Sequence, residues 1–207
     1  MPRMKLLAPV LALVTLTSFA LADEVEPVPE GKTLAIARLL ISVLGAPTDA
    51  PLSTDVDAEK AVAIQAGQAG LLAMPDKKLT AEALSASTKD PVVLGQLWMH
   101  KVVPAVDKAA PAPEKLRTLT VHGDNEDADA EVYYLGVAKG ESGALELSLF
   151  GKDKTPLVKV PLVKTDAAAS ATPIALNGRK DDDHTGTLVI TVFGSYKADV
   201  TVTRPRE

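Results

Sequence analysis

Apolar residues in the first half of the chain recur with the spacing of a helix. In the stretch KTLAIARLLISVLG they lie three or four positions apart, at Leu34, Ala37, Leu40, Ile41 and Leu44. This spacing places them on one face of a helix, and a glycine follows as a stop signal. Because the polar face of this helix is thin, we expect it to be buried on most sides.

A second helix is predicted over residues 58–74, AEKAVAIQAGQAGLLAM. Either Asp55 or Asp57 can cap its start. Gly67 and Gly70 lie within this segment. They could mark a site where two helices approach closely, but we favour the alternative that they are small residues tolerated in an Ala-rich helix. The apolar stripe of this segment consists of Val62, Ala66, Ala69 and Leu72.

Two more segments carry helix start signals. Thr80 can cap a short helix in LTAEALSAST, and Asp90 can cap a longer one in KDPVVLGQLWMHKVVPAV. Pro91 then stands at the first helical position, where proline is favoured, and Pro104 ends the segment. Together the signals predict a small bundle of three or four helices over residues 30–107.

The second half of the chain has apolar positions with period two, which is typical of strands. Seven runs between residues 116 and 204 alternate apolar and polar residues, and Gly, Asp, Asn and Pro stand between them. Pro161 cannot donate to a ladder, so its strand is expected at an edge or at a bulge. The pattern predicts an antiparallel β-sandwich of immunoglobulin-like architecture, without the Cys–Trp–Cys hallmark of true immunoglobulin domains.

The predicted fold class is therefore α+β in two parts, a helical bundle followed by a β-sandwich. Residues 108–115, rich in proline and alanine, would form a stiff linker between them. Residues 23–29 are acidic and proline-rich and are expected to form a disordered leader, and residues 205–207 form a tail.

The N-terminal residues 1–22 have the layout of a secretory signal peptide. Arg3 and Lys5 precede an apolar run from Leu6 to about Leu21, and Ala20-Leu21-Ala22 forms a small-x-small cleavage signal. A retained membrane anchor is the alternative, but the run is shorter than the ~20 apolar residues of a membrane span. We expect a secreted or periplasmic protein with no membrane span after cleavage.

The composition of the chain limits the classes of partner that it can bind. The chain has no cysteine, so neither disulfides nor lipid attachment to cysteine are available. The formal charge of −5 becomes −7 when the positive charges of Arg3 and Lys5 are removed with the signal peptide. An acidic chain with few aromatic residues is a poor ligand for nucleic acid or for an anionic membrane, since both repel it. A cation, a protein or a polysaccharide remains as a possible partner.

No catalytic motif is recognisable in the sequence: G-x-S-x-G, S-x-x-K, H-E-x-x-H, Walker and G-x-G-x-x-G patterns are all absent. The chain has three histidines, at positions 100, 122 and 184. His100 stands beside Trp98 and Met99 and is interpreted as structural. It would be the best residue of a hydrolase site between the two parts, with Asp107 or Asp90 as its partner.

Acidic residues concentrate in two predicted loops. The first contains Asp124, Asp127 and Asp129, and the second contains Asp181, Asp182 and Asp183. If the strands alternate in direction, both loops lie at one end of the sandwich, and their carboxylates could hold calcium, which takes six to eight oxygen ligands. The alternative is ordinary soluble turns, since Asp suits turn geometry and nearby Lys and Arg can neutralise it. A transition-metal site with His122 and His184 is a further, weaker alternative.

The function expected from the sequence is a non-catalytic binding or structural module of the cell envelope or extracellular space, with calcium as a possible ligand of its acidic loops. A secreted hydrolase with a site between the helical and β parts is the alternative. A chaperone or inhibitor that offers a strand to another secreted protein is a third possibility. A large apolar patch near Trp98 and Met99 would indicate a protein partner.

Overall fold

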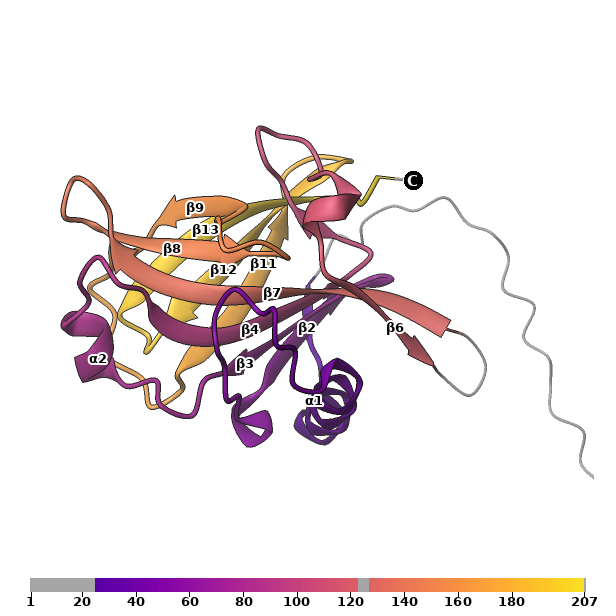
Figure 1. Ribbon diagram of the computed structural model, residues 1–207, viewed down its shortest axis with the longest axis horizontal. Coiled ribbons are helices and arrows are strands. Elements are labelled where there is room, and N and C mark those ends of the chain that lie inside the picture. The colour runs from indigo at the N-terminus through magenta and orange to yellow at the C-terminus, as the bar shows by residue number, and fades with distance from the viewer. Residues whose placement is uncertain (1–24, 123–126, 207) are drawn as a thin grey trace, which may run out of the picture.

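Two antiparallel β-sheets pack face to face, and a long helix covers the outer face of the larger sheet (Figure 1). This computed structural model describes residues 25–122 and 127–206. The predicted signal peptide, residues 1–22, and Asp124 therefore lie outside the described residues. No helix within the described ranges has both the length and the apolar composition needed to cross a membrane.

The larger sheet draws its strands from both halves of the chain. In spatial order they are β1 (Glu26–Pro27), β2 (Val62–Ala66), β3 (Ala69–Pro75), β4 (Val92–His100), β7 (Asp127–Lys139), β8 (Leu145–Phe150) and β9 (Val158–Pro161). The strand β6 (Thr118–His122) pairs with the beginning of β7, and Figure 1 shows this hairpin projecting beyond the two layers.

The smaller sheet comes almost entirely from the last quarter of the chain. Its order is β10 (Val163–Lys164), β13 (Tyr196–Thr203), β12 (Thr185–Val192) and β11 (Ile174–Lys180), and β5 (Val103–Pro104) pairs with the end of β13. Pro161 ends β9 at the edge of the larger sheet, as its missing N–H requires.

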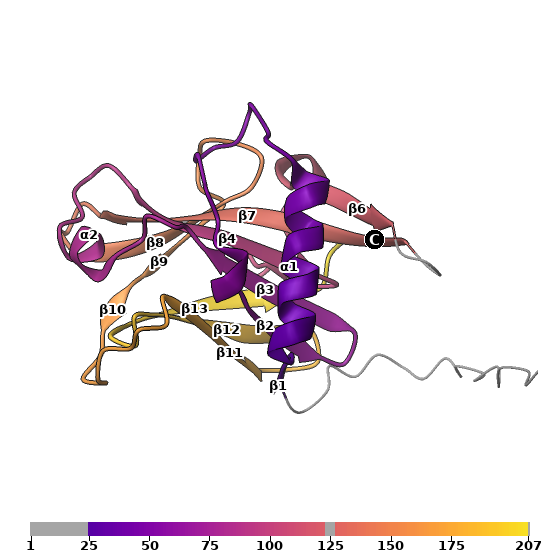
Figure 2. The same cartoon turned by 90° about the horizontal axis from the view of Figure 1, so that it is seen from below.

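The helical segments are few. They are α1 (Glu30–Leu44), α2 (Ala81–Ser85) and the short 3-10 turns η1 (Ala58–Lys60) and η2 (Pro113–Lys115). Figure 2 shows α1 running across the strands of the larger sheet. Its buried residues Ala37 and Leu40 pack on Leu72, Met74 and Trp98 of that sheet.

The main hydrophobic core lies between the two sheets. Inward-facing residues of β3, β4 and β7, such as Leu71, Leu97 and Leu135, meet Leu188 and Ile190 of β12 across the interface. The larger sheet is thus covered on both faces, by α1 on one side and by the smaller sheet on the other.

The prediction of an N-terminal helical bundle is wrong. Residues 58–74 form mainly the β2–β3 hairpin, and residues 92–100 form β4. Gly67 has a φ of +58°, which L side chains rarely adopt, and it lies in the turn of the hairpin. The α+β, two-part fold class is therefore replaced by a mostly β sandwich with one covering helix.

The error has a physical cause. A strand that is buried on both faces has no polar side, so its apolar residues run on and cannot be distinguished from a buried helix by period. In β4, Leu97 and Met99 face the smaller sheet while Trp98 faces α1. Pro91, interpreted as a helix start, stands immediately before this strand, where proline is also tolerated.

Other local predictions are confirmed. The helix expected from Gly31 is α1, but it is not buried on most sides as expected, because only Thr33, Ala37 and Leu40 are buried. The short helix after Thr80 is α2, whose Ala83 N–H donates to Thr80 Oγ1 over 3.1 Å. The seven predicted strand runs all contain strands, from β6 to β13. They do not form a sandwich by themselves, because they are divided between the two sheets and the larger sheet is completed by β1 to β4.

Candidate functional site

The Asp-Asp-Asp-His stretch forms the turn between β11 and β12. Asp182 organises it: Oδ1 accepts from the backbone N–H groups of His184 and Thr185, both over 2.7 Å, and Oδ2 accepts from Thr185 Oγ1, also over 2.7 Å. The bond from the His184 N–H, followed by those from Thr185, lowers the pKa of Asp182 below its ordinary value. This carboxylate is engaged by its own turn.

The two neighbouring aspartates also have local partners. Asp181 accepts from Thr187 Oγ1 over 2.5 Å and from Arg179 Nε over 3.2 Å. Asp183 lies 3.1 Å from Lys180 Nζ. These contacts are those of a tight soluble turn, which is the alternative that the sequence leaves open.

Asp127 and Asp129, which were predicted in the first acidic loop, lie on β7 where it pairs with β6. Thr120 Oγ1 donates to Asp129 Oδ1 over 2.7 Å, and His122 Nδ1 lies 3.0 Å from Asp127 Oδ1. Among the described residues no group of three or more His, Asp or Glu side chains is placed to hold a metal ion. Since Asp124 lies outside those residues, calcium binding by the acidic loops stays a prediction.

An apolar cavity opens at the end of the sandwich where the Asp-Asp-Asp-His turn lies. Its volume is about 60 Å³, and it lies between the β2–β3 hairpin and the ends of β11, β12 and β13. At roughly 10–15 Å³ for each water-sized group, it has room for about four to six such groups. Its apolar wall consists of Val25, Ile64, Ala66, Ala69, Leu71, Val102, Leu188 and Val202.

The polar residues of the lining all come from the region of the smaller sheet. They are Arg179, Lys180, His184, Thr187, Thr203 and Arg204, and neither Asp nor Glu is found among the described residues of the lining. His184 and Arg204 are exposed to solvent, so the basic side chains mark the mouth. The arrangement can take an apolar group inside and donate hydrogen bonds at the opening.

A larger, shallower groove lies on the other face of the β2–β3 hairpin, beside α1. Its volume is about 360 Å³, and Ile36, Leu39, Trp98, Met99 and Val121 contribute to its mainly apolar lining. This is the apolar surface near Trp98 and Met99 at which the sequence would place a protein partner, and that partner stays a prediction.

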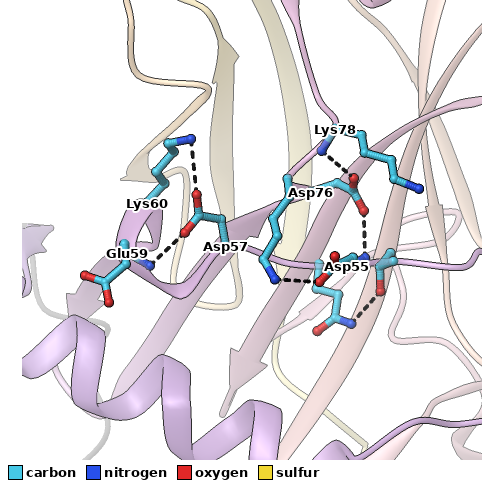
Figure 3. Close-up of polar contacts among 9 residues, drawn as sticks. Asp55, Asp57, Glu59, Lys60, Asp76 and Lys78 are labelled. Atoms are coloured by element: carbon cyan, nitrogen blue, oxygen red, sulfur yellow. Dashed lines mark hydrogen bonds and ion pairs between the residues drawn. The ribbon is translucent and has the colours of Figure 1, made fainter.

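A dense polar cluster lies beyond the C-terminal end of α1 (Figure 3). The buried carboxylate of Asp76 accepts from the backbone N–H groups of Asp55, over 2.8 Å, and Lys78, over 2.9 Å. Buried Gln96 donates to Thr54 Oγ1 over 2.8 Å and accepts from the Trp98 indole over 3.2 Å. These bonds fasten residues 54–57 to β3 and β4, which is a structural role.

The surrounding charges of this cluster are balanced. Lys77 Nζ lies 2.8 Å from Asp55 Oδ1, and Lys60 Nζ lies 3.1 Å from Asp57 Oδ2. Paired surface charges of this kind contribute little energy, and these carboxylates and ammonium groups already have partners within the cluster. The cavity at the end of the sandwich is therefore the stronger candidate site.

The sequence placed the alternative hydrolase site, with His100 as its best residue, in a cleft between a helical and a β part. His100 lies at the end of β4, and its Nδ1 contacts the backbone carbonyl oxygen of Asp129 over 2.7 Å. The expected cleft between a helical and a β part depended on a helical bundle that the fold does not contain.

Sequence reasoning missed the cavity, and no local signal could have shown it. Its lining comes from six separate segments, from Val25 to Arg204, which only the folded sheets bring together. Comparison of the chain with protein-family models, with curated proteins and with solved structures gives no match. The cavity is therefore the structural basis for assigning a function.

Proposed function

We propose that the chain is a non-catalytic binding protein that acts outside the cytoplasm and takes a small apolar group into the cavity at the end of its sandwich. The observation that carries the proposal is the cavity itself, whose lining is mainly apolar and includes a few polar residues from the smaller sheet and the turn between β11 and β12. Binding sites for small molecules have this distribution, a mainly hydrophobic lining with a few placed polar groups.

Secretion belongs to the same proposal. It is supported by the basic start and apolar run of residues 1–22, followed by the small-x-small signal at Ala20-Leu21-Ala22. The absence of recognisable catalytic motifs supports binding rather than catalysis.

A neutral ligand tests the binding site without involving charge. We expect 1-hexanol, titrated into the purified protein and followed by backbone amide NMR, to shift signals of the cavity lining on β2, β3 and β12. Ala66→Leu should abolish these shifts. Ala66 lies two residues after inward-facing Ile64 on β2, so its side chain is on the same face, and the larger leucine side chain would fill the cavity.

The matched control is Ala175→Leu. Ala175 is exposed on the outer face of β11, so the same substitution there should leave the hexanol titration unchanged. Shifts scattered over the surface, or shifts equally strong in the Ala66→Leu variant, would contradict the proposal.

A further inference from the structure

The strand β6 has an open edge. It pairs with β7 on one side, and no other strand of the described residues pairs with it. The Val132 N–H donates to the Arg117 carbonyl oxygen over 3.0 Å, which fixes the phase of this ladder. Because bonded and non-bonded pairs alternate in an antiparallel ladder, the backbone N–H and C=O groups of Thr118, Thr120 and His122 point away from β7. These groups have no hydrogen-bond partner within the part of the chain that the structure describes.

The other edges of the two sheets carry features that hinder the addition of a strand. Short length, proline and charged side chains are the usual protections of an edge. The strands β1 and β10 have only two residues each, β9 contains Lys159 and Pro161, and β11 contains Arg179. The sequence of β6, TLTVH, contains neither proline nor Lys, Arg, Asp or Glu. Its hairpin also projects beyond the two layers (Figure 1), so a further strand can lie along β6 without meeting the smaller sheet.

The two faces of β6 determine which side chains an added strand needs. Leu119 and Val121 are half-buried and pack against the cluster beneath α1. Thr118, Thr120 and His122 alternate with them and are exposed on the opposite face. Side chains of neighbouring strands meet on the same face, so every second residue of an added strand would lie beside the two apolar residues of β6. We expect those residues of the added strand to be apolar.

The exposed face of the hairpin is acidic. Asp129 Oδ1 accepts from Thr120 Oγ1 over 2.7 Å, and Asp127 Oδ1 lies 3.0 Å from His122 Nδ1. Both carboxylates therefore extend from β7 over β6, towards its open edge. Neither β6 nor residues 127–131 of β7, which pair with it, contain Lys or Arg. Since neighbouring strands lie only about 4.8 Å apart, a long basic side chain of an added strand can reach these carboxylates.

We propose that β6 accepts, as an additional strand, an extended segment of a basic partner protein in which apolar residues alternate with Lys or Arg. The outward-facing backbone of β6 supplies the ladder, and the two aspartates select the basic series. Recognition by strand addition has this division, in which main-chain bonds give affinity and alternate side chains give specificity. A second copy of this acidic chain is disfavoured, because it would bring two more aspartates to the same face. The edge shares no residue with the cavity lining, so this proposal is independent of the proposed function.

Three short blocked peptides with the same valines separate charge from backbone pairing. Peptides of sequence KVKVKVK, SVSVSVS and EVEVEVE, each with a fluorescent label, are titrated with the full chain and followed by anisotropy. We expect KVKVKVK to bind at least about ten times more tightly than SVSVSVS, and EVEVEVE to bind most weakly, because the edge is acidic. Bound KVKVKVK should slow amide hydrogen exchange at Thr118, Thr120 and His122, and should leave exchange at Lys159 on β9 unchanged.

Removal of one outward-facing N–H tests the ladder on the protein side. Thr120→Pro leaves the bonds between β6 and β7 in place, since proline is tolerated where the N–H of an edge strand faces solvent. We expect this variant to lose peptide binding. Lys159→Pro is the matched control: Lys159 stands two residues before Pro161 on β9, so its N–H also faces outward, and its replacement should leave binding unchanged.

The same bonds can be tested on the peptide side, without any change to the protein. The lysines of KVKVKVK lie opposite the outward-facing residues of β6, so their N–H groups point to β6 and those of the valines point to solvent. N-methylation of the lysines should therefore abolish binding, and N-methylation of the valines should preserve it. This pair of peptides decides the question if Thr120→Pro does not fold.

Neutralising the aspartates tests the charge selection. Asp127→Asn with Asp129→Asn should weaken KVKVKVK binding by roughly fivefold and leave SVSVSVS binding unchanged, since each exposed ion pair contributes little. Asp153→Asn with Asp166→Asn is the control. These two aspartates are exposed and lie outside the hairpin, so the net charge changes equally and peptide binding should not.

Each remaining outcome overturns the proposal in a recognisable way. Equal binding of KVKVKVK and EVEVEVE would mean that the edge does not select a basic partner. Protection of the β6 amides that grows with protein concentration, in the absence of peptide, would mean that a second copy of the chain occupies the edge. If no peptide binds, β6 is not a docking edge, and the hexanol test of the cavity is unaffected.

Discussion

Glu131 has an unusual environment for a carboxyl group. It is 7% exposed on β7, and its Oε2 has no hydrogen-bond partner among the described residues. Burial, assisted by the negative charge of Asp129, raises the pKa of Glu131 to about 7. A backbone hydrogen bond at Glu131 and, to a smaller extent, the charge of Lys101 oppose this rise. The group therefore keeps its proton in the folded protein at pH values where an unfolded chain has lost it.

This raised pKa makes a prediction about stability and pH. Between about pH 4.5 and 7 the folded state binds the proton of Glu131 and the unfolded state does not, so stability falls as pH rises. The favourable contribution is fully present below pH 4.5 and is lost as pH passes through 7, a change of about 3 kcal/mol at most. Glu131→Gln should remove this part of the pH dependence, because its neutral amide stays neutral at pH 8.

Urea unfolding at pH 5 and pH 8 measures the effect. The unmodified protein should lose more stability between the two pH values than Glu131→Gln does. Glu141→Gln, in the exposed β7–β8 turn, is the control and should keep the full dependence. Identical pH slopes for Glu131→Gln and the unmodified protein would contradict the prediction.

At the scale of single elements, β4 is distorted at Gly95. The pairing of β4 with β7 shifts between Val93 and Gly95, which is the signature of a β-bulge. Gly95 has a φ of +141°, and a Cβ there would overlap the backbone carbonyl oxygen of Met74 on β3. The bulge therefore requires glycine for two reasons, backbone conformation and the close approach of the neighbouring strand.

We expect Gly95→Ala to destabilise the protein by at least about 2 kcal/mol, because both the backbone strain and the overlap must be relieved by moving β3 or β4. Gly70→Ala, on the adjacent strand, should change stability little, since a Cβ there meets no atom within 4 Å. Thermal unfolding of both variants checks the contrast. A similar loss of stability in the two variants would mean that the general effect of replacing a strand glycine, rather than the bulge at Gly95, accounts for the loss.

The elements that sequence could predict are those with one polar face. In β13, Val200 and Val202 point inward while Thr201 points to solvent, so the alternation is visible in the sequence. In β3, Leu71 packs between the sheets and Leu72 packs under α1, so both faces are apolar and the alternation disappears. Whether such a segment forms a strand or a helix depends on the layers that pack on its two faces, and the local sequence does not show these layers.

The candidate site also has one part that the sequence could predict and one part that it could not. The Asp-Asp-Asp-His turn could be located at one end of the sandwich from strand alternation, and its local bonds are those of the soluble turn considered from the start. The cavity behind it could not be predicted, because Ile64 and Val202 approach it from strands in different sheets. The sequence indicates only that lysines such as Lys180 can neutralise the nearby aspartates, whereas the structure places Lys180 in the lining of the cavity.

At the scale of the whole molecule, the two halves of the chain are parts of the same sheet. The strand β4, from the first half, pairs along β7, from the second, with Leu97 opposite Tyr133 and Trp98 opposite Val132. The core between the sheets likewise contains residues from before and after the proline-rich segment 108–115. Neither half can complete its hydrophobic faces without the other.

This sharing predicts a single cooperative unfolding transition. The chain has one tryptophan, Trp98, which is buried under α1 and reports on the first half, while far-UV circular dichroism reports mainly on all strands together. Denaturant curves from the two probes should coincide, as two-state unfolding requires. A fragment of residues 116–207 should fail to fold, because β7 would lose β4 and expose Tyr133 and Leu135 to water. Two separated transitions, or a folded fragment, would instead mean that the second half is an independent domain.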